Sequence, residues 1–419
     1  MKTRLPQLLL AILLGCTAVQ AATWTTEEGA NCSFDNADQK YFGRTIVTEN
    51  GKTVLVYDNL RDDYKTLNIK DCTINTTGYD EFRTTTSKGS PIVVANTVIE
   101  GNDVTFDGTV RFQASSELNA ENVTLKGSSL VRNSAKVTAS DTVVISGTTA
   151  ILFGATVEAK TISLESTSSS AVQEASLTAD TVKLNGSSIE IGGSKKAVIN
   201  AKQIEVNSGT LTVAKDAELT TNSITLNGGK LVNNGNIGGV VSLAEGAEGN
   251  VITITDGELV NSGSIESTIN MTGGTLVAEA GSAIAGINAT GGDIQVDGDF
   301  SMTGDLVLGG DAELIFADAD YTIDLGEYDV EFSGNSSIAL TLADADIANV
   351  VLFTGAKEDR YSGYEVTLLD AEGNSTGTAV MKYNANGDVT LGTAAVPEPT
   401  TATLSLLALA ALATRRRRR

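Results

Sequence analysis

The side chains that could carry chemistry in this chain are carboxylates, because the sequence contains no histidine. That absence excludes Ser-His-Asp and Cys-His nucleophilic sites and every histidine-ligated metal site. Paired carboxylates could still act as general acid and base on a polysaccharide. The candidates are Asp62, Asp63, Glu158, Glu190 and Glu205. They share no position in the repeat described below, so solvated surface charge is the favoured interpretation and no catalytic residue is predicted.

Two groups of aspartates could bind a hard cation. Asp293, Asp297 and Asp299 lie among glycines, and clustered carboxylate oxygens suit Ca²⁺. The second group is Asp318, Asp320 and Asp324. The spacing departs from the Gly-Gly-x-Gly-x-Asp calcium repeat. The expectation is therefore no metal and no other cofactor, with Ca²⁺ as the alternative.

These residues would be positioned by a repeat with a period near 20. Each unit holds an apolar pair at positions i and i+2, which points both side chains to one face of a strand. A glycine after the pair suits a turn with positive φ. The first apolar residues of successive units are Val123, Val143, Ile162, Val182, Ile204 and Ile224. Stacked units would align them in one apolar ladder, which predicts a parallel β-helix, or β-solenoid.

Further units extend this all-β pattern at both ends. Val104 begins an earlier unit, and Ile252, Ile269 and Ile287 begin later ones. The predicted solenoid covers residues 95–310, about 11 coils with a length on the order of 50 Å. Solenoid ends expose unpaired backbone, so caps are expected. Residues 22–94 are the predicted N-terminal cap, and residues 311–395 are a predicted C-terminal β-domain.

Composition agrees with a folded, repetitive and acidic body. Hydrophobic residues make up 41% and aromatic residues only 5%, which favours thin layers of small side chains over one large core. The net charge of −23 disfavours nucleic acid and anionic lipid as partners.

The N-terminal residues indicate export. Residues 1–21 have a basic start, an apolar run and small residues before Ala21, where a signal peptide would be cleaved. A lipoprotein processing box ending at Cys16 is the alternative. Cys32 and Cys72 stay in the exported part in both cases, and an oxidising compartment favours a disulfide between them. Two free thiols are the other possibility.

The C-terminal residues form a three-part tail. A sorting motif precedes an apolar segment over residues 400–414, which is expected to be a hydrophobic helix, and an arginine cluster then acts as a membrane stop. The motif is Val396, Pro397, Glu398 and Pro399, and the stop is Arg415, Arg416, Arg417, Arg418 and Arg419. This order resembles the PEP-CTERM sorting signal of exopolysaccharide-producing Gram-negative bacteria, which implies processing by an exosortase-like enzyme. A plain tail anchor is the alternative.

These features predict a noncatalytic exported protein of the outer surface or extracellular matrix of a Gram-negative bacterium, adhesin-like or a structural spacer. The units rich in Asn and Gly resemble those of autotransporter passengers and other β-helical adhesins. The expected partners are an exosortase-like enzyme, the inner membrane through the unprocessed tail, and an extracellular glycan or exopolysaccharide. The alternative function is a surface polysaccharide lyase or glycoside hydrolase. Carboxylates lining one groove would favour the enzyme, and smooth polar faces would favour adhesion or scaffolding.

Overall fold

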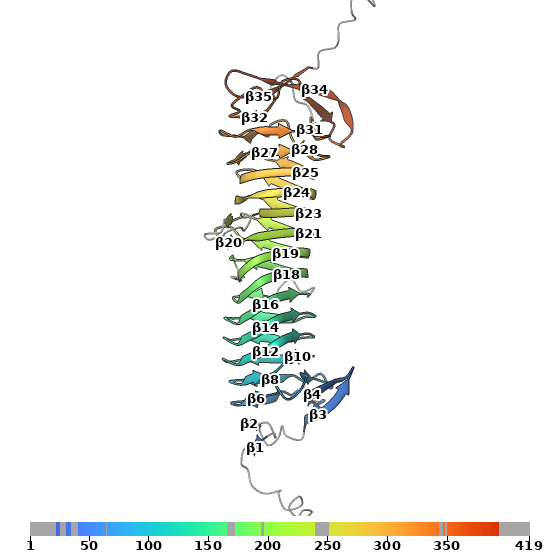
Figure 1. The fold of residues 1–419 in the computed structure, drawn as a ribbon, viewed down its shortest axis with the longest axis vertical. Coiled ribbons are helices and arrows are strands. Elements are labelled where there is room, and N and C mark those ends of the chain that lie inside the picture. The colour runs from blue at the N-terminus through green and yellow to red at the C-terminus, as the bar shows by residue number, and fades with distance from the viewer. Residues whose placement is uncertain are drawn as a thin grey trace, which may run out of the picture.

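The strands of this protein stack into a β-solenoid of about 12 turns, which confirms the predicted fold class (Figure 1). The computed structural model describes residues 22–25, 31–34, 41–63, 65–165, 172–193, 197–238, 251–342, 347 and 350–393. Within these ranges the chain forms strands and turns and no α-helix. None of the described segments is a helix that could span a membrane. The hydrophobic helix expected over residues 400–414 lies outside the described ranges.

The N-terminal strands begin with antiparallel pairs, and from β5 to β11 they are short because each covers one side of a coil. They are β1 (Ala22–Thr25), β2 (Asn31–Phe34), β3 (Phe42–Glu49), β4 (Lys52–Asn59), β5 (Leu67–Lys70), β6 (Thr73–Asn75), β7 (Glu81–Thr85), β8 (Ile92–Ala95), β9 (Val98–Glu100), β10 (Asp103–Phe106) and β11 (Val110–Gln113).

Several strands in the middle are longer because they continue around a corner of the coil. The middle strands are β12 (Glu117–Leu125), β13 (Leu130–Arg132), β14 (Lys136–Ile145), β15 (Ala150–Leu152), β16 (Thr156–Leu164), β17 (Val172–Gln173), β18 (Ser176–Ile191), β19 (Val198–Val213), β20 (Glu218–Thr220), β21 (Ser223–Asn233), β22 (Asn236–Gly238), β23 (Val251–Asn261), β24 (Ser264–Glu279) and β25 (Ala283–Asp297).

The C-terminal strands become short again and end in an antiparallel layer. They are β26 (Phe300–Met302), β27 (Leu306–Leu308), β28 (Glu313–Phe316), β29 (Ile323–Asp324), β30 (Val330–Phe332), β31 (Ser337–Thr341), β32 (Val351–Thr354), β33 (Glu365–Leu369), β34 (Ser375–Tyr383) and β35 (Val389–Thr393).

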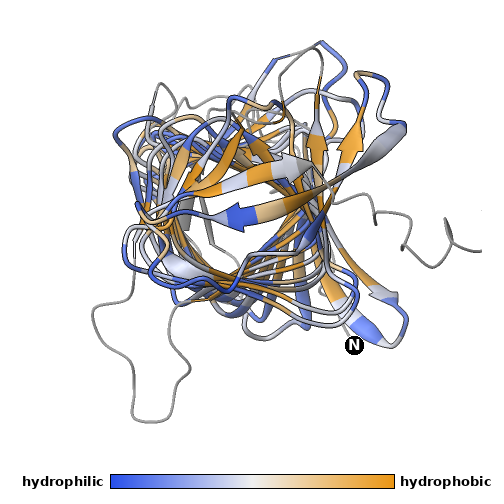
Figure 2. Cartoon of the chain, turned by 90° about the horizontal axis from the view of Figure 1, so that it is seen from above, coloured by the Kyte–Doolittle hydropathy of each residue, from blue (hydrophilic) through white to orange (hydrophobic). Residues whose placement is uncertain are grey.

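Each coil contributes to three faces of parallel strands. The first face contains β4, β7, β10 and β27; the second contains β5, β8, β11 and β28; the third contains β6, β9, β26 and β29. The long middle strands pass from one face to the next at shifts in register. Viewed from above, the coils superpose in one closed outline, with hydrophobic residues alternating with hydrophilic ones (Figure 2).

The predicted apolar ladder is present on the inner side of the first face. Val123 lies beside Val143, and the pairing continues coil by coil through Val182 and Ile204 to Ile224. Each ladder residue is at most 1% exposed. The register also includes the earlier and later units that begin at Val104, Ile252, Ile269 and Ile287. Alternation along each strand then places the intervening residues on the solvent side.

Stacked glycines make the corner after the first face. Gly127 and Gly147 have φ of +73° and +67°, a region that disfavours other residues. A Cβ atom on Gly147 would lie 2.8 Å from the carbonyl oxygen of Gly127 in the coil below. Glycine is therefore required at these two turn positions both by backbone conformation and by close contact between coils.

The parallel register extends beyond both predicted limits of the repeat region, residues 95 and 310. Before residue 95, β4, β5 and β6 already pair in parallel with β7, β8 and β9. After residue 310, β28 and β29 pair in parallel with β31 and β32. Antiparallel strands close the ends, with β3 on β4 at one end and β33, β34 and β35 at the other.

Candidate functional site

A shallow groove crosses the first face where β7, β10, β12 and β14 lie side by side, with a volume of about 450 Å³. Its polar lining comes from Glu81, Asp103, Thr105, Asn122, Thr124 and Thr142. These side chains point outward because Val104 and its neighbours in the ladder point inward. Register places Asp103 between Glu81 and Asn122, so two carboxylates meet on adjacent strands.

The β3–β4 hairpin supplies a cation to one of these carboxylates. Lys52 Nζ lies 2.7 Å from Asp103 Oδ2, and Asn122 Nδ2 donates to Asp103 Oδ1 at 2.9 Å. Lys52 and Asp103 are 51 positions apart in the chain. The chain winds through two coils between these residues, so the ion pair forms only when the coils stack.

The second carboxylate of the groove is also ion-paired. Arg83 donates two parallel hydrogen bonds to the Glu81 carboxylate, from Nε at 2.9 Å and from Nη2 at 3.0 Å. Arg83 Nη1 also lies 3.0 Å from Oε2 of Glu49, at the end of β3. The hairpin is therefore tied to the first face at two points.

The electrostatics of the groove favour ion pairs. Burial alone would raise the pKa of Asp103, but hydrogen bonds from Lys52 and Asn122 outweigh it and the pKa falls below the usual 3.8. The hydrogen bond with Asp103 raises the pKa of Lys52, and the bonds with Glu81 do the same for the pKa of Arg83. A general acid for glycoside cleavage needs a carboxyl group whose pKa is raised. Asp103 has the opposite shift.

The carboxylates singled out from the sequence are not brought together. Glu158 on the third face lies 3.0 Å from Lys136, and Glu205 on the first face lies 2.9 Å from Lys183. Glu190 belongs to the part of β18 on the second face. Asp63 lies 2.9 Å from Arg61 in the turn that also contains Asp62.

The two aspartate groups accept hydrogen bonds from their own coil or from the next one. Asp299 Oδ1 accepts from the backbone of Thr322 at 2.8 Å, and Asp297 Oδ1 accepts from Gln295 at 2.8 Å. In the second group, the carboxylates accept from backbone N–H groups two positions further along the chain, Asp318 from Asp320 at 3.1 Å and Asp324 from Gly326 at 3.0 Å. Asp293 lies on β25, between Thr275 and Glu313 of the neighbouring coils. No group of three or more Cys, Asp or Glu suited to a metal ion occurs in the described ranges.

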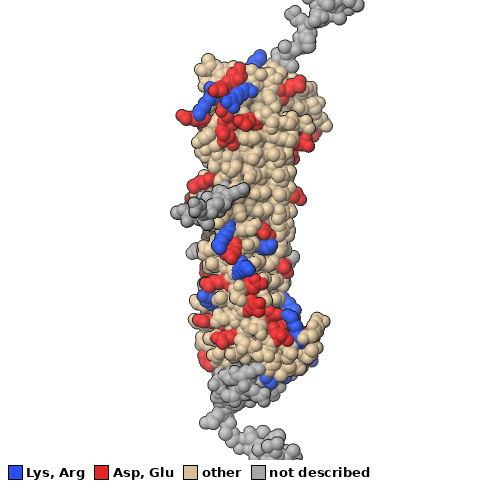
Figure 3. Space-filling model, viewed as in Figure 1, with Lys and Arg blue, Asp and Glu red and all other residues tan. Residues whose placement is uncertain are grey.

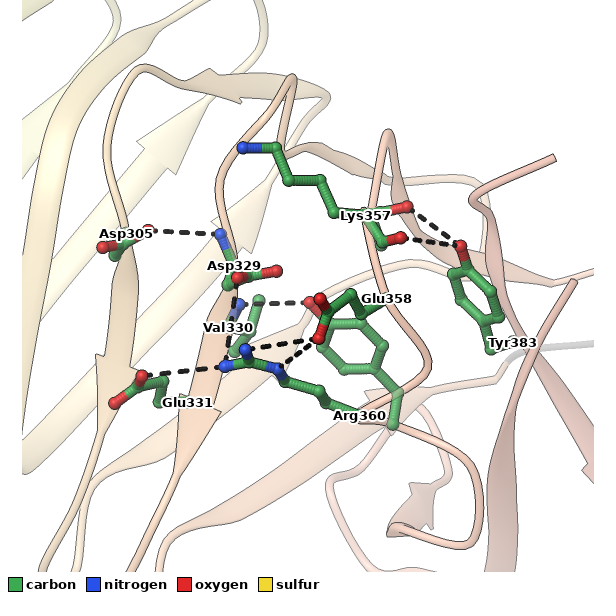
Figure 4. Close-up of polar contacts among 10 residues, drawn as sticks. Asp305, Asp329, Val330, Glu331, Lys357, Glu358, Arg360 and Tyr383 are labelled. Carbon is green, nitrogen blue, oxygen red and sulfur yellow. Dashed lines mark hydrogen bonds and ion pairs between the residues drawn. The ribbon is translucent and has the colours of Figure 1, made fainter. Parts of the chain in front are cut away.

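A second charged cluster holds the C-terminal cap (Figure 4). Arg360 Nη1 lies 3.9 Å from both Asp329 and Glu331, and its Nε lies 3.4 Å from Glu358. Asp329 makes the largest contribution to the raised pKa of Arg360. The backbone N–H of Asp329 donates to Asp305 at 3.2 Å, which connects the cluster to the coil below.

Two tyrosines fix the same loop. The fully buried Tyr361 hydroxyl accepts from the backbone N–H of Val330 at 3.2 Å. Tyr383 donates to the carbonyl oxygens of Ala356 and Lys357, each at 3.3 Å. Neither charged cluster was predicted from the sequence. Glu81 and Arg83 could have been paired from their spacing, because positions i and i+2 share one face of a strand. Glu358 and Arg360 have the same spacing but lie in the loop between β32 and β33, where it carries no such meaning.

The predicted cysteine pair lies at the N-terminal end. Ser33 on β2 pairs with Lys70 on β5, so the backbone at Cys32 lies near the turn that leads to Cys72. The Cys72 side chain is buried, with its sulfur 3.8 Å from Thr97 Oγ1. The described part of Cys32 is its backbone, and the disulfide stays a prediction.

The signal and sorting residues predicted at the chain ends lie outside the described residues. They are Ala21, Val396, Pro397, Glu398, Pro399 and Arg415 to Arg419.

Comparison with known families identifies the tail. Residues 395–419 match the PEP-CTERM protein-sorting motif. No curated protein and no solved structure matches the chain. The motif is a sorting signal recognised by exosortase, which supports an exosortase-like enzyme as the processing partner. The protein is therefore an exported protein of the cell envelope that joins a β-solenoid body to a PEP-CTERM sorting motif.

Proposed function

We propose that this protein is a noncatalytic rod of the outer surface or extracellular matrix of a Gram-negative bacterium, which acts as an adhesin-like spacer. The observation that carries the proposal is the parallel register from β4 to β32, which leads through the cap to a sorting motif two residues after the last strand. With the tail at the membrane, the solenoid projects away from it. Release by processing would leave a free rod of the same length.

A spacer needs a defined length and resistance to bending. About 12 turns at a strand separation of about 4.8 Å give a rod of about 60 Å. Neighbouring inner coils are hydrogen-bonded to each other on two or three faces, so bending would break many backbone bonds together. Caps at both ends favour a discrete rod over end-to-end growth.

The groove chemistry supports a noncatalytic role. Glu81 and Asp103 are the two carboxylates that face each other across adjacent coils, and both are held by cations of the same chain. The lowered pKa of Asp103 opposes proton donation near neutral pH. An ion-paired groove favours hairpin anchoring over bond cleavage.

The outer surface supports a binding or spacing role. On the first face, Thr225, Thr253, Asn270 and Asn288 follow one another in register on four successive coils. These uncharged side chains form a smooth polar column. On the face seen in Figure 3, charged side chains gather over the N-terminal half and at the cap, with a nearly uncharged band below the cap.

The sorting part of the proposal predicts loss of the tail. The apolar segment of residues 400–414 would span about 22 Å as a helix, less than the roughly 30 Å hydrocarbon core, which suits transient retention. In an exosortase-containing host, mass spectrometry of surface-exposed protein should find no peptides from residues 404–414. Their recovery from most surface molecules would mean a permanent anchor.

Two tail variants separate recognition from retention. Pro397→Glu should leave the protein membrane-held with its tail intact, because the sorting motif is lost while the stop remains. Deleting residues 415–419 should release unprocessed protein, because the arginines hold the tail at the membrane. Thr401→Ser is the matched control and should be processed normally.

A polysaccharide depolymerisation assay tests the proposal that the protein is noncatalytic. Purified protein incubated with neutral and uronate-containing polysaccharides should release no reducing ends and no unsaturated products. Product release that disappears in both Glu81→Gln and Asp103→Asn would overturn the noncatalytic proposal and assign the groove as an active site.

A further inference from the structure

One aromatic residue interrupts an otherwise aromatic-free stretch of the rod. Between Phe112 and Phe300, the sequence contains a single aromatic residue, Phe153. Its side chain does not join the aliphatic interior, since the residue is 49% exposed. Phe153 occupies the corner between β15 on the second face and β16 on the third.

The backbone at Phe153 is strained. Its φ is +54°, in the left-handed region that costs a bulky residue roughly 1–2 kcal/mol. Asn133 and Ala114 hold the equivalent place in the two preceding coils, with φ of +55° each, and backbone hydrogen bonds stack these corners. Asparagine tolerates this conformation because its polar side chain can bond locally.

Phe153 is therefore expected to lower the free energy of unfolding in two ways. It adds backbone strain that asparagine would reduce, and it exposes a ring to water where the neighbouring coils have small or polar side chains. Strain that packing does not explain is characteristic of functional positions. The corner itself has no structural need for an aromatic residue.

A hollow of about 460 Å³ adjoins this corner. Its lining includes Gly154, Ala155, Thr156, Glu174, Ser176 and Val198. Thr156, Ser176 and Val198 lie side by side at the starts of β16, β18 and β19 on the third face. Val198, which is 47% exposed, is the large apolar side chain of this lining. Phe153 borders the hollow, because it directly precedes Gly154 in the chain and lies one coil from Glu174.

We propose that this hollow is a binding subsite for one pyranose ring of a neutral glycan. The apolar C–H face of a sugar ring packs on an aromatic side chain, while its hydroxyls need donors and acceptors at the edge. Phe153 and Val198 supply the apolar contacts, and the hydroxyls of Thr156 and Ser176 and the carboxylate of Glu174 supply the polar ones. The Glu174 carboxylate and the net charge of −23 disfavour a uronate. This inference deepens the proposed adhesin-like function and rests on it.

The test uses the full mature protein with defined sugars as probes. Cellohexaose and maltohexaose are titrated by ligand-observed NMR, with hexagalacturonate as the acidic comparison. At least one neutral hexasaccharide should bind, and hexagalacturonate should bind more weakly. Phe153→Asn should weaken binding of the neutral sugar about tenfold or more, because it removes the ring.

The same variant should raise thermal stability, which separates binding from folding. Phe153→Asn relieves the strained backbone, so Tm should rise by about 2 °C while binding is lost. Glu174→Gln should keep the sugar contact and reduce the discrimination against hexagalacturonate. Tyr328→Ala removes a 39% exposed aromatic residue near the other end of the rod and should leave sugar binding unchanged.

Three outcomes would overturn the subsite. The first is no binding of either neutral sugar, and the second is equal binding by the parent and Phe153→Asn. The third is concentration-dependent dimerisation that Phe153→Asn abolishes in the absence of sugar, which would make this corner a contact between two copies. Surface display and tail processing are scored on the same proteins, so failure of the subsite is distinguishable from failure of the surface-rod proposal.

Discussion

The middle of the rod and its two ends are packed with different kinds of side chain. In the middle, identical positions in successive coils carry Val, Ile or Leu, each in register with a side chain of similar shape. At the ends, aromatic rings take over. Tyr57 packs edge-on against Phe42 and Phe82 at 4.8 and 5.0 Å, and Phe353 lies 5.9 Å from Phe316 at the other end.

This difference follows from the number of neighbours. An inner coil is covered above and below by copies of itself, so modest aliphatic side chains fill the interior completely. A terminal coil lacks one neighbour, and larger rings with antiparallel strands cover the exposed layer. The unpaired backbone must also be satisfied. Leu306 donates its N–H to the next coil, whereas the equivalent Val330 donates to the hydroxyl of Tyr361.

The sharpest way to break the middle is to place a charge in the ladder. Ile204→Asp buries a carboxylate between Val182 and Ile224, with no partner, and should cost at least about 4 kcal/mol in free energy of unfolding. Urea unfolding followed by far-UV circular dichroism measures this. Gln203→Asp points the same group outward and should cost less than about 0.5 kcal/mol. Equal unfolding midpoints for the two variants would contradict the inward orientation of Ile204.

The stability of the N-terminal end should depend on a disulfide, whereas the stability of the middle depends on packing. A Cys32–Cys72 disulfide would close a loop of about 40 residues and add about 4 kcal/mol on the chain-entropy model. Labelling of denatured, unreduced mature protein should therefore find no free thiol, and reduction should lower Tm. Two labelled thiols per chain would show that this end is closed by packing and ion pairs.

The C-terminal end should be sensitive to one hydroxyl group. Tyr361→Phe keeps the ring but leaves the buried N–H of Val330 without its acceptor, at a cost of about 1–2 kcal/mol. Thermal unfolding of the two proteins measures the loss. Tyr328→Phe is the matched control on a half-exposed tyrosine and should not change Tm. Equal losses in both variants would mean that the capping hydrogen bond contributes nothing.

The smallest effect should come from the ion pairs of the hairpin. Because folding lowers the pKa of Asp103, its contribution to stability is present above the ordinary value of 3.8 and disappears as pH falls through the lower folded pKa. Asp103→Asn should therefore lower Tm slightly at pH 6, and the difference should shrink at pH 3. Asp62→Asn, at an exposed site, controls for net charge. A difference that grows on acidification would refute the assigned role of Lys52.

Sequence periodicity was sufficient to predict the parallel register in the middle of the rod but not at its ends. The pairs at i and i+2 every 20 or so residues predicted the ladder, because the same side chain must recur wherever the same neighbours recur. Beyond residue 310 the step between equivalent positions grows from 19 residues, Ile287 to Leu306, to 24 residues, Leu306 to Val330. Longer turns and aromatic core residues interrupt the sequence repeat there, so the same parallel register could not be predicted from its period.

The sequence alone determined that the chain carries a sorting tail, contains no histidine chemistry, and has one isolated aromatic residue in its middle. The tail needs no partner from elsewhere in the chain to be recognised. Tertiary structure alone decided that Lys52 neutralises Asp103 and that Phe153 faces solvent beside a hollow. Both depend on how coils stack, because a side chain's neighbours in a solenoid are about one coil away in sequence and are set by the corners between strands.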